Sequence, residues 1–278
     1  VIFQGHMDMV CEKEFDSKHD FKIDGLTLKT DGEYIFADKT TLGADDGIAV
    51  AIMLALLDSK TIKHPPIECL ITTQEEVGLG GAFAIESDKI SAKKMINIDT
   101  EEEGVLLASC AGGLVVDVTK DLSFINAQGA EFKIVINGLK GGNSGIDIDK
   151  ERANASKLMS RILSNVLDKV PFNLANFEGG TKDNAITRDC IANVFISNEN
   201  KDNFMTEFNS QVAIIKEELA ITDAEFNAEI KESNDFNKML DEKGTYESIN
   251  LIYTLPSGVV SKSIEIANFV VASLNMGI

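Results

Sequence analysis

The first hundred residues combine short, continuously apolar runs with one longer apolar segment. Residues 1–5, 67–73 and 93–99 each contain a short apolar run without regular alternation, as is typical of strands buried on both faces. Residues 48–57 are apolar on every side and predict a helix that is buried all round. Continuous rather than alternating apolar strands, separated by a helix, indicate a mostly parallel sheet covered on both faces. The pattern therefore predicts an α/β layer.

A different order of elements begins after residue 113. It predicts strands at 131–139, 172–178, 190–196 and 225–233, with amphipathic helices at 149–170 and 203–219. The resulting order β-α-β-β-α-β is that of a ferredoxin-like split unit. The remaining residues predict a turn at 254–259 and a last helix around 261–276. We therefore expect two domains, an α/β domain over 1–113 and a ferredoxin-like α+β domain over 114–278.

Composition excludes several classes of function. The net charge of −19 argues against nucleic-acid partners and anionic membrane surfaces, because both require clustered Lys and Arg. No apolar run approaches the length needed to span a bilayer, and no basic region precedes the first apolar run, so no signal peptide is predicted. The four cysteines form no CxxC pair and are expected to be free thiols, which suits a reducing cytoplasm.

Acidic and imidazole side chains recur where predicted strands end and where the apolar helix begins. They are His6 and Asp8, Asp45 and Asp46, Glu75 and Glu76, and Asp99. In open α/β sheets the carboxyl ends of strands converge on the functional crevice, so these groups are expected to lie together. Clustered carboxylates repel one another unless a cation lies among them. Mixed His and carboxylate ligands suit Zn²⁺, and also Mn²⁺ or Co²⁺.

The first two pairs each have a structural alternative. A histidine at a strand end is often only a hydrogen-bonded structural residue, but His6 and Asp8 are two residues apart and share a strand face. Asp8 can then accept a hydrogen bond from the ring nitrogen that does not bind metal. The sequence GADDG is equally compatible with a helix N-cap in which Asp46, and less readily Asp45, accepts hydrogen bonds from free backbone N–H groups.

The remaining acidic residues also have alternatives. Adjacent glutamates such as Glu75 and Glu76 are usually a solvated pair, but here they end a buried apolar strand and precede three glycines. The run that follows Asp99, residues 101–103, is interpreted as surface charge. The shared placement of these groups at strand ends, rather than any one motif, indicates a metal site.

Seven motifs resemble one known family. They are GHMDMV, TTLGADDGIAVA, TTQEEVGLGGA, INIDTEEEG, CAGG, GLKGGNSGIDI and GGTKDNAI. In this order they resemble the aminoacyl-histidine dipeptidase branch (β-alanyl-histidine or carnosine-type) of the dinuclear zinc metallopeptidase family. The resemblance covers essentially the whole chain. It implies a zinc-dependent enzyme that hydrolyses dipeptides, a catalytic metal-binding domain over 1–113 and a lid or dimerisation domain over 114–278.

The resemblance also implies a role for each matching residue. His6 and Asp99 would bind one zinc ion, Glu76 would bind the other, Asp45 would bridge both, Asp8 would orient His6, and Glu75 would be the general base. Glu75 would take a proton from a metal-activated water and pass it to the leaving amine. No covalent nucleophile is needed in such a site, and the sequence offers no convincing one.

In the second domain the resemblance implies substrate contacts at Asn143 and Asn184. The family has a histidine at the position of Asn143, which reaches the substrate in the partner subunit's site, so the chain is expected to form a homodimer. An amide donates a hydrogen bond but carries no positive charge, so this departure puts the usual transition-state stabilisation in doubt. The family's proline is Thr187 here. Asn184 is equally compatible with a simple turn residue.

Members of this branch are longer and contain a further zinc-binding histidine after the lid. His19 and His64 both lie in predicted loops and are poor substitutes, so the chain is expected to be an incomplete portion with four of five protein ligands. Two alternatives therefore stay open. One is a catalytically incompetent homologue that acts by association through its ferredoxin-like domain, and the other is a tripeptidase or deacylase of the same family.

Overall fold

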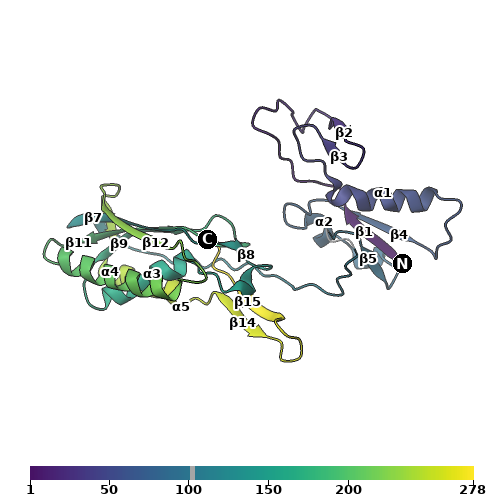
Figure 1. Ribbon diagram of the computed structural model, residues 1–278. Coiled ribbons are helices and arrows are strands. Elements are labelled where there is room, and N and C mark those ends of the chain that lie inside the picture. Colours follow the sequence, from purple (N-terminus) through teal and green to yellow (C-terminus); the bar gives the residue numbers. More distant parts are fainter. Residues whose placement is uncertain (101–103) are drawn as a thin grey trace. The chain divides into compact units, whose positions relative to one another are not determined.

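The computed structural model describes residues 1–100 and 104–278, so the expected surface charge at Glu101–Glu103 lies outside the described residues. The chain divides into two compact units, Val1–Gly112 and Gly113–Ile278 (Figure 1). Each is described by itself below. Within the described residues, no helix combines the length and apolar character required to cross a membrane.

The first unit is built on a three-stranded parallel sheet. Its order is β4 (Glu68–Thr72), β1 (Ile2–His6), β5 (Met95–Asn97), with β1 in the centre. The helix α1 (Ala44–Asp58) packs against β1 (Figure 1). The predicted α/β layer with a parallel sheet is confirmed, and β1 extends one residue beyond the predicted strand. The predicted cover on both faces is wrong for β5, which is exposed along its length. The carboxyl ends of β1 and β4 lie side by side because His6 pairs with Thr72.

The surroundings of α1 differ from the prediction of a helix buried all round. Only Asp46, Ala49 and Met53 are buried, whereas Ile48 and Leu54 are more than half exposed, at 54% and 58%. The reason is that the helix contacts the sheet along one face only. An apolar composition on every side therefore predicted the helix but not the extent of its burial.

Smaller elements complete the first unit. They are the hairpin β2 (Leu28–Thr30) and β3 (Ile35–Ala37), the short helix α2 (Gly80–Phe83) and the 3-10 turn η1 (Ser87–Lys89). The sequence pattern did not predict them, because each is only three or four residues long.

The second unit contains the predicted ferredoxin-like order. Its elements are β7 (Ala130–Asn137), α3 (Ala155–Leu167), β9 (Asn173–Gly179), β11 (Cys190–Ile196), α4 (Lys201–Glu218) and β12 (Asn227–Glu232). The strands form one antiparallel sheet in the order β12-β7-β11-β9. The predicted fold class is confirmed here too.

The core of the second unit lies between this sheet and helices α3 and α4 (Figure 1). Phe204 on α4 is fully buried at its centre. Its ring meets that of Phe172 edge-on at 5.3 Å between centroids and stacks on that of Phe208 at 6.4 Å. Offset and edge-on aromatic pairs of this kind are favourable beyond the area they bury, so Phe204 is a central packing residue.

The rest of the second unit departs from the prediction in two ways. The predicted last helix around 261–276 is wrong, because the chain forms a hairpin of β14 (Gly258–Lys262) and β15 (Val270–Leu274). Each of the two strands contains two Val residues, which are β-branched and favour strands. A helix that was not predicted, α5 (Glu242–Thr254), begins where the side chain of Asp241 accepts the N–H of Gly244. The remaining elements are β6 (Phe124–Asn126) paired with β13 (Lys238–Leu240), β8 (Gly142–Asn143) paired with β10 (Ala185–Ile186), and η2 (Ile148–Lys150).

A buried carboxylate connects the sheet to the segment that follows β12. Glu131 is 5% exposed. It accepts hydrogen bonds from Asn193 Nδ2 and Ser233 Oγ, both at 2.7 Å, and from the backbone N–H of Phe236 at 3.0 Å. Burial alone raises the pKa of Glu131, but these hydrogen bonds outweigh it and leave the pKa below its ordinary value.

The lowered pKa of Glu131 predicts a pH-dependent contribution to stability. The contribution is present above the ordinary Glu pKa of 4.5 and is lost as the pH falls through the lower value of the folded state. Glu131→Gln should therefore reduce the free energy of unfolding by about 1–3 kcal/mol at neutral pH. In urea unfolding followed by circular dichroism, the difference from wild type should shrink as the pH falls below 4.5. A difference independent of pH, or one matched by the exposed control Glu217→Gln, would contradict this assignment.

Candidate functional site

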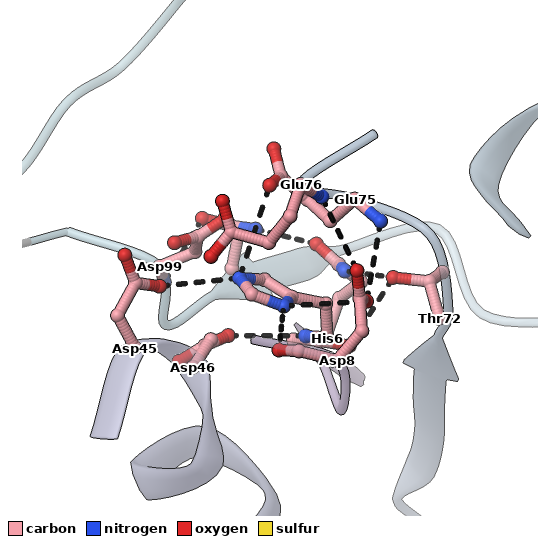
Figure 2. Close-up of polar contacts among 11 residues, drawn as sticks. His6, Asp8, Asp45, Asp46, Thr72, Glu75, Glu76 and Asp99 are labelled. Carbon is pink, nitrogen blue, oxygen red and sulfur yellow. Dashed lines mark hydrogen bonds and ion pairs between the residues drawn. The ribbon is translucent and has the colours of Figure 1, made fainter. Parts of the chain in front are cut away.

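His6 ends the central strand of the first unit and is buried, at 1% exposure. Its backbone N–H donates to Asp46 Oδ2 at 3.2 Å. Its ring nitrogen Nδ1 lies 2.9 Å from the backbone carbonyl oxygen of Asp8, and Nε2 lies 3.1 Å from Asp45 Oδ1. Figure 2 shows the acidic side chains gathered around this ring.

The surroundings of the His6 ring constrain its protons. A carbonyl oxygen only accepts, so Nδ1 must carry a proton to bond to Asp8. Nε2 then faces the carboxylate of Asp45 and needs either a second proton or a cation between the two groups. Burial alone lowers the pKa of His6, but the bonds to Asp45 and Asp8 outweigh it and raise the pKa. The arrangement therefore favours positive charge at Nε2.

Asp8 joins the loops that follow β1 and β4. Its carboxylate accepts the backbone N–H groups of Glu75 and Glu76, each at 3.2 Å, and lies 3.5 Å from Nδ1 of His6. Burial raises the pKa of Asp8, and the two backbone hydrogen bonds more than reverse this and lower it. The carbonyl of Asp8, rather than its carboxylate, is the nearer acceptor of the His6 ring. The carboxylate instead fixes the backbone of both glutamates.

Glu75 extends toward the same ring. Its Oε2 lies 4.0 Å from Nε2 of His6, and its side chain is one third exposed. Burial raises the pKa of Glu75. Nearby His6 opposes this, while the charges of Asp99, Glu76 and Asp45 add to it, so the pKa is raised overall. A carboxylate with a raised pKa beside a polar cluster is a suitable proton acceptor and donor.

Among residues 1–100 and 104–278, two groups of side chains could each hold a metal ion. The ligand atoms of His6, Asp45 and Glu76 lie within 4.8 Å of one another, and so do those of His6, Asp46 and Asp99. The structure thus brings together all four residues that the resemblance implies as ligands. The second group also includes Asp46, for which the sequence was equally compatible with an N-cap role. Asp46 accepts backbone N–H groups from both His6 and Ala49, so it combines a capping contact with a place in the second group. In the sequence, only its position next to Asp45 had indicated that Asp46 could belong to a metal-binding group.

These residues fit a divalent cation. The donor set is one neutral imidazole nitrogen and several carboxylate oxygens, the set that Zn²⁺, Mn²⁺ and Co²⁺ accept. The ion pairs described for Asp8, Asp45 and Glu75 all involve His6, with no Lys or Arg among them. A cation at Nε2 would satisfy both the ring nitrogen and the carboxylate that faces it.

Gly5 is required by the close approach of α1 to β1. A Cβ at this position would overlap the Cβ of Ala49 and Oδ2 of Asp46. Because Asp46 holds the backbone of His6, displacement of α1 would also disturb the site.

We expect Gly5→Ala to lower the free energy of unfolding of the first unit by about 1–3 kcal/mol through overpacking. Urea unfolding followed by circular dichroism measures this. Gly47→Ala is the matched control, since a Cβ at Gly47, within α1, meets open space and Ala favours a helix. Equal stability of Gly5→Ala and wild type would show that α1 is not held against β1 as described.

The two predicted substrate contacts lie in the second unit, next to each other. Asn143 on β8 pairs with Ala185 on β10, and the backbone carbonyl of Asn184 accepts the N–H of Ser144 at 2.9 Å. Asn143 Oδ1 accepts the N–H groups of Gly145 and Ile146, at 2.8 and 3.1 Å. Its Nδ2 is therefore the group left to donate to a ligand. Both side chains are exposed.

Thr187, which stands where the family has proline, is buried. Its hydroxyl donates to the carbonyl of Met276 at 2.8 Å. The other two histidines lie outside the site. His64 Nδ1 faces the carbonyl of the neighbouring Pro65, and the ring of His19 contacts that of Phe21.

Comparison with known proteins identifies a matching domain and two similar proteins. Residues 134–223 match the M20 family described as a peptidase dimerisation domain. The chain is 36% identical over 282 residues to the cytosol non-specific dipeptidase of Escherichia coli (strain K12), covering 100% of this chain and 58% of that protein. An uncharacterised protein of Bacillus subtilis (strain 168), YqjE, is 28% identical over 194 residues, or 67% of this chain and 45% of that one.

Among solved structures, the aminoacylhistidine dipeptidase of Vibrio alginolyticus superposes with a TM-score of 0.83 at 37% identity. The match covers 100% of this chain and 57% of that structure, so the chain spans little more than half the length of these relatives. The expected resemblance is confirmed by these matches over the full length of the chain. The chain therefore contains the peptidase dimerisation domain of the M20 family and is similar over its whole length to part of these dipeptidases.

Proposed function

We propose that this chain is part of a metal-dependent dipeptidase that hydrolyses short peptides, with aminoacyl-histidine dipeptides as its substrate class. The observation that carries the proposal is the buried His6, whose Nε2 faces Asp45 and lies 4.0 Å from Glu75. The names of the relatives support the substrate class, since one is a non-specific dipeptidase and another an aminoacylhistidine dipeptidase.

Four side chains would hold the metal ions. We propose that His6 and Asp99 bind one Zn²⁺, Glu76 binds a second, and Asp45 bridges the two, with Mn²⁺ or Co²⁺ as alternatives. Bound divalent ions polarise a peptide carbonyl and lower the pKa of a bound water to about 7. Asp8 orients this set, because its carbonyl fixes the His6 ring and its carboxylate fixes the backbone of Glu76.

Glu75 is the proposed general base. Its carboxylate takes a proton from the attacking water and donates it to the amine that leaves when the peptide bond breaks. The raised pKa of Glu75 suits both halves of this transfer, since a weakly basic carboxylate would take up the proton poorly. Asp8 holds the backbone N–H of Glu75 and so limits where its side chain can reach.

We further propose that residues 1–113 form the metal-binding part of the catalytic domain and residues 114–278 a lid that pairs two chains into a homodimer. The match to a dimerisation domain within the second unit supports the pairing. Asn143 would donate from Nδ2 to the substrate or its oxyanion, and Asn184 would contact the substrate beside it. The E. coli relative is named for the cytosol, and we propose a cytoplasmic location for this protein.

Metal binding and hydrolysis test the proposal together. The full chain, titrated with Zn²⁺ by calorimetry, is expected to bind it tightly, and His6→Ala should weaken binding by about 10–100-fold or more. The Zn²⁺-loaded chain is then assayed with β-alanyl-histidine. His64→Ala is the matched control, because His64 lies in an exposed loop outside the site. A chain that binds no divalent metal, or that binds it equally well without His6, would overturn the proposed site. Absence of dipeptide hydrolysis from the metal-loaded whole protein, of which this chain is part, would overturn the proposed activity.

A further inference from the structure

A buried aspartate outside the proposed metal site contacts the segment that carries Asn143. The segment, residues 140–153, lies between β7 and α3, and we call it the Asn143 loop. Asp223 follows α4 and is 1% exposed. Its Oδ1 accepts the backbone N–H of Lys140 at 2.9 Å, and its Oδ2 accepts that of Ala153 at 3.0 Å. One carboxylate therefore holds both ends of the loop.

The interior of the Asn143 loop has its own hydrogen bonds. Arg152 Nη1 donates to the carbonyl of Gly141 at 2.6 Å, and the backbone N–H of Asn143 donates to Asp147 Oδ2 at 2.9 Å. These bonds shape the loop from within, and the pairing of β8 with β10 attaches its middle, whereas its two ends are held by Asp223. Gly141 and Gly142, next to Lys140, both have positive φ, at 61° and 137°, in a region that glycine enters freely. Both glycines therefore adopt backbone conformations that other residues rarely take, next to the end of the loop that Asp223 holds.

We propose that Asp223 is a positioning residue for the hydrolytic reaction, because it fixes the Asn143 loop and through it the Nδ2 group of Asn143. This inference rests on the proposed function, in which Asn143 contacts the substrate. Hydrogen bonds from backbone N–H groups to a buried carboxylate are strong, and loss of one leaves a buried polar group without a partner. A donor displaced by about 1 Å is enough to lower a reaction rate by about 100-fold.

The test compares Asp223→Asn with Glu131→Gln in the full chain. Both replace a buried carboxylate that accepts backbone N–H groups in the same unit, but Glu131 bonds to Asn193, Ser233 and Phe236 and not to the Asn143 loop. In Asp223→Asn the amide nitrogen must face one of the two backbone N–H groups, so one end of the loop is released. Should this variant not fold, Asp223→Ser serves instead, since its hydroxyl still accepts one bond.

Hydrogen exchange is expected to rise by about tenfold or more in residues 141–152 of Asp223→Asn, with β11 unchanged. Glu131→Gln should leave residues 141–152 unchanged. With β-alanyl-histidine, Asp223→Asn should lower kcat by about 10–100-fold with little change in KM, while Glu131→Gln retains wild-type kcat.

Unchanged exchange in the Asn143 loop would overturn the proposal. So would faster exchange with kcat no lower than that of Glu131→Gln. An inactive wild-type whole protein would instead overturn the proposed function, and hydrogen exchange alone would then decide whether Asp223 holds the loop.

Discussion

Glu75→Gln is expected to lower kcat for dipeptide hydrolysis by about 10²–10⁴-fold, the usual contribution of a general base. Glutamine keeps the shape of the side chain and the backbone hydrogen bond to Asp8, but its amide cannot take a proton from water. Steady-state kinetics with β-alanyl-histidine measures the loss. Because Glu75 is not a proposed ligand, metal content determined by elemental analysis should stay at the wild-type value.

Two further substitutions distinguish the role of Glu75 as general base from a role in metal binding. Glu76→Gln removes a proposed ligand, so it should lower both activity and metal content. Glu86→Gln, at an exposed position of the same unit, should change neither. Loss of metal from Glu75→Gln, or activity within a few-fold of wild type, would rule out the assignment of Glu75 as the base.

Phe204→Ala is expected to reduce the free energy of unfolding of the second unit by about 3–5 kcal/mol. The ring is fully buried and contacts the rings of both Phe172 and Phe208, so its removal leaves a cavity and separates two aromatic pairs. Equilibrium unfolding in urea, followed by circular dichroism, measures the change.

Ile264→Ala is the control for this prediction, since Ile264 is fully exposed in the same unit. It should change stability by less than about 0.5 kcal/mol. A similar small effect for Phe204→Ala would mean that the core between α4 and the sheet is not packed as described.

Much of the fold was predictable because local pattern and tertiary environment agree in the ferredoxin-like unit. β11 (Cys190–Ile196) is an apolar run, interrupted by Asn193, that coincides with the predicted strand, and it is one of the two strands of the sheet with a neighbour on each side. α3 (Ala155–Leu167) has one apolar stripe and a strong N-cap at Asn154, whose side chain accepts the N–H groups of Ser156 and Lys157. Pattern and burial lead to the same structure here.

The misassigned segments lack that agreement. Residues 261–276 contain apolar side chains at helical spacing, but the hydroxyl of Ser263 accepts the N–H groups of Glu265 and Ile266 and turns the chain back on itself. The helix α5 begins with Glu242–Gly244 and contains Thr245 and Tyr246, residues of modest helix propensity. Its start depends on the Asp241 cap, a single side chain without a periodic signal.

For the candidate site, the sequence indicated which residues to consider, and the fold determined their contacts. Strand ends identified His6 and Glu75, because parallel strands bring their carboxyl ends together. The sequence could not predict that the carbonyl of Asp8 bonds to His6 while its carboxylate bonds to Glu75. These separate contacts depend on the path of the loop after β1. The hydrogen bonds of Asp223 to the Asn143 loop were also not predictable, because Asp223 is 70 residues or more away in the sequence from the N–H groups that it accepts.

The three hydrogen bonds of Asp8 also determine which changes of chain length the protein can accept near the site. Its carboxylate accepts hydrogen bonds from the consecutive backbone N–H groups of Glu75 and Glu76, while its backbone carbonyl accepts one from the ring of His6. One added or deleted residue between Thr72 and Glu75 would bring different amides to that carboxylate and move both glutamates at once. Insertions and deletions should therefore be selected against in this short stretch, and loop grafting at this rim of the sheet would have to preserve its length.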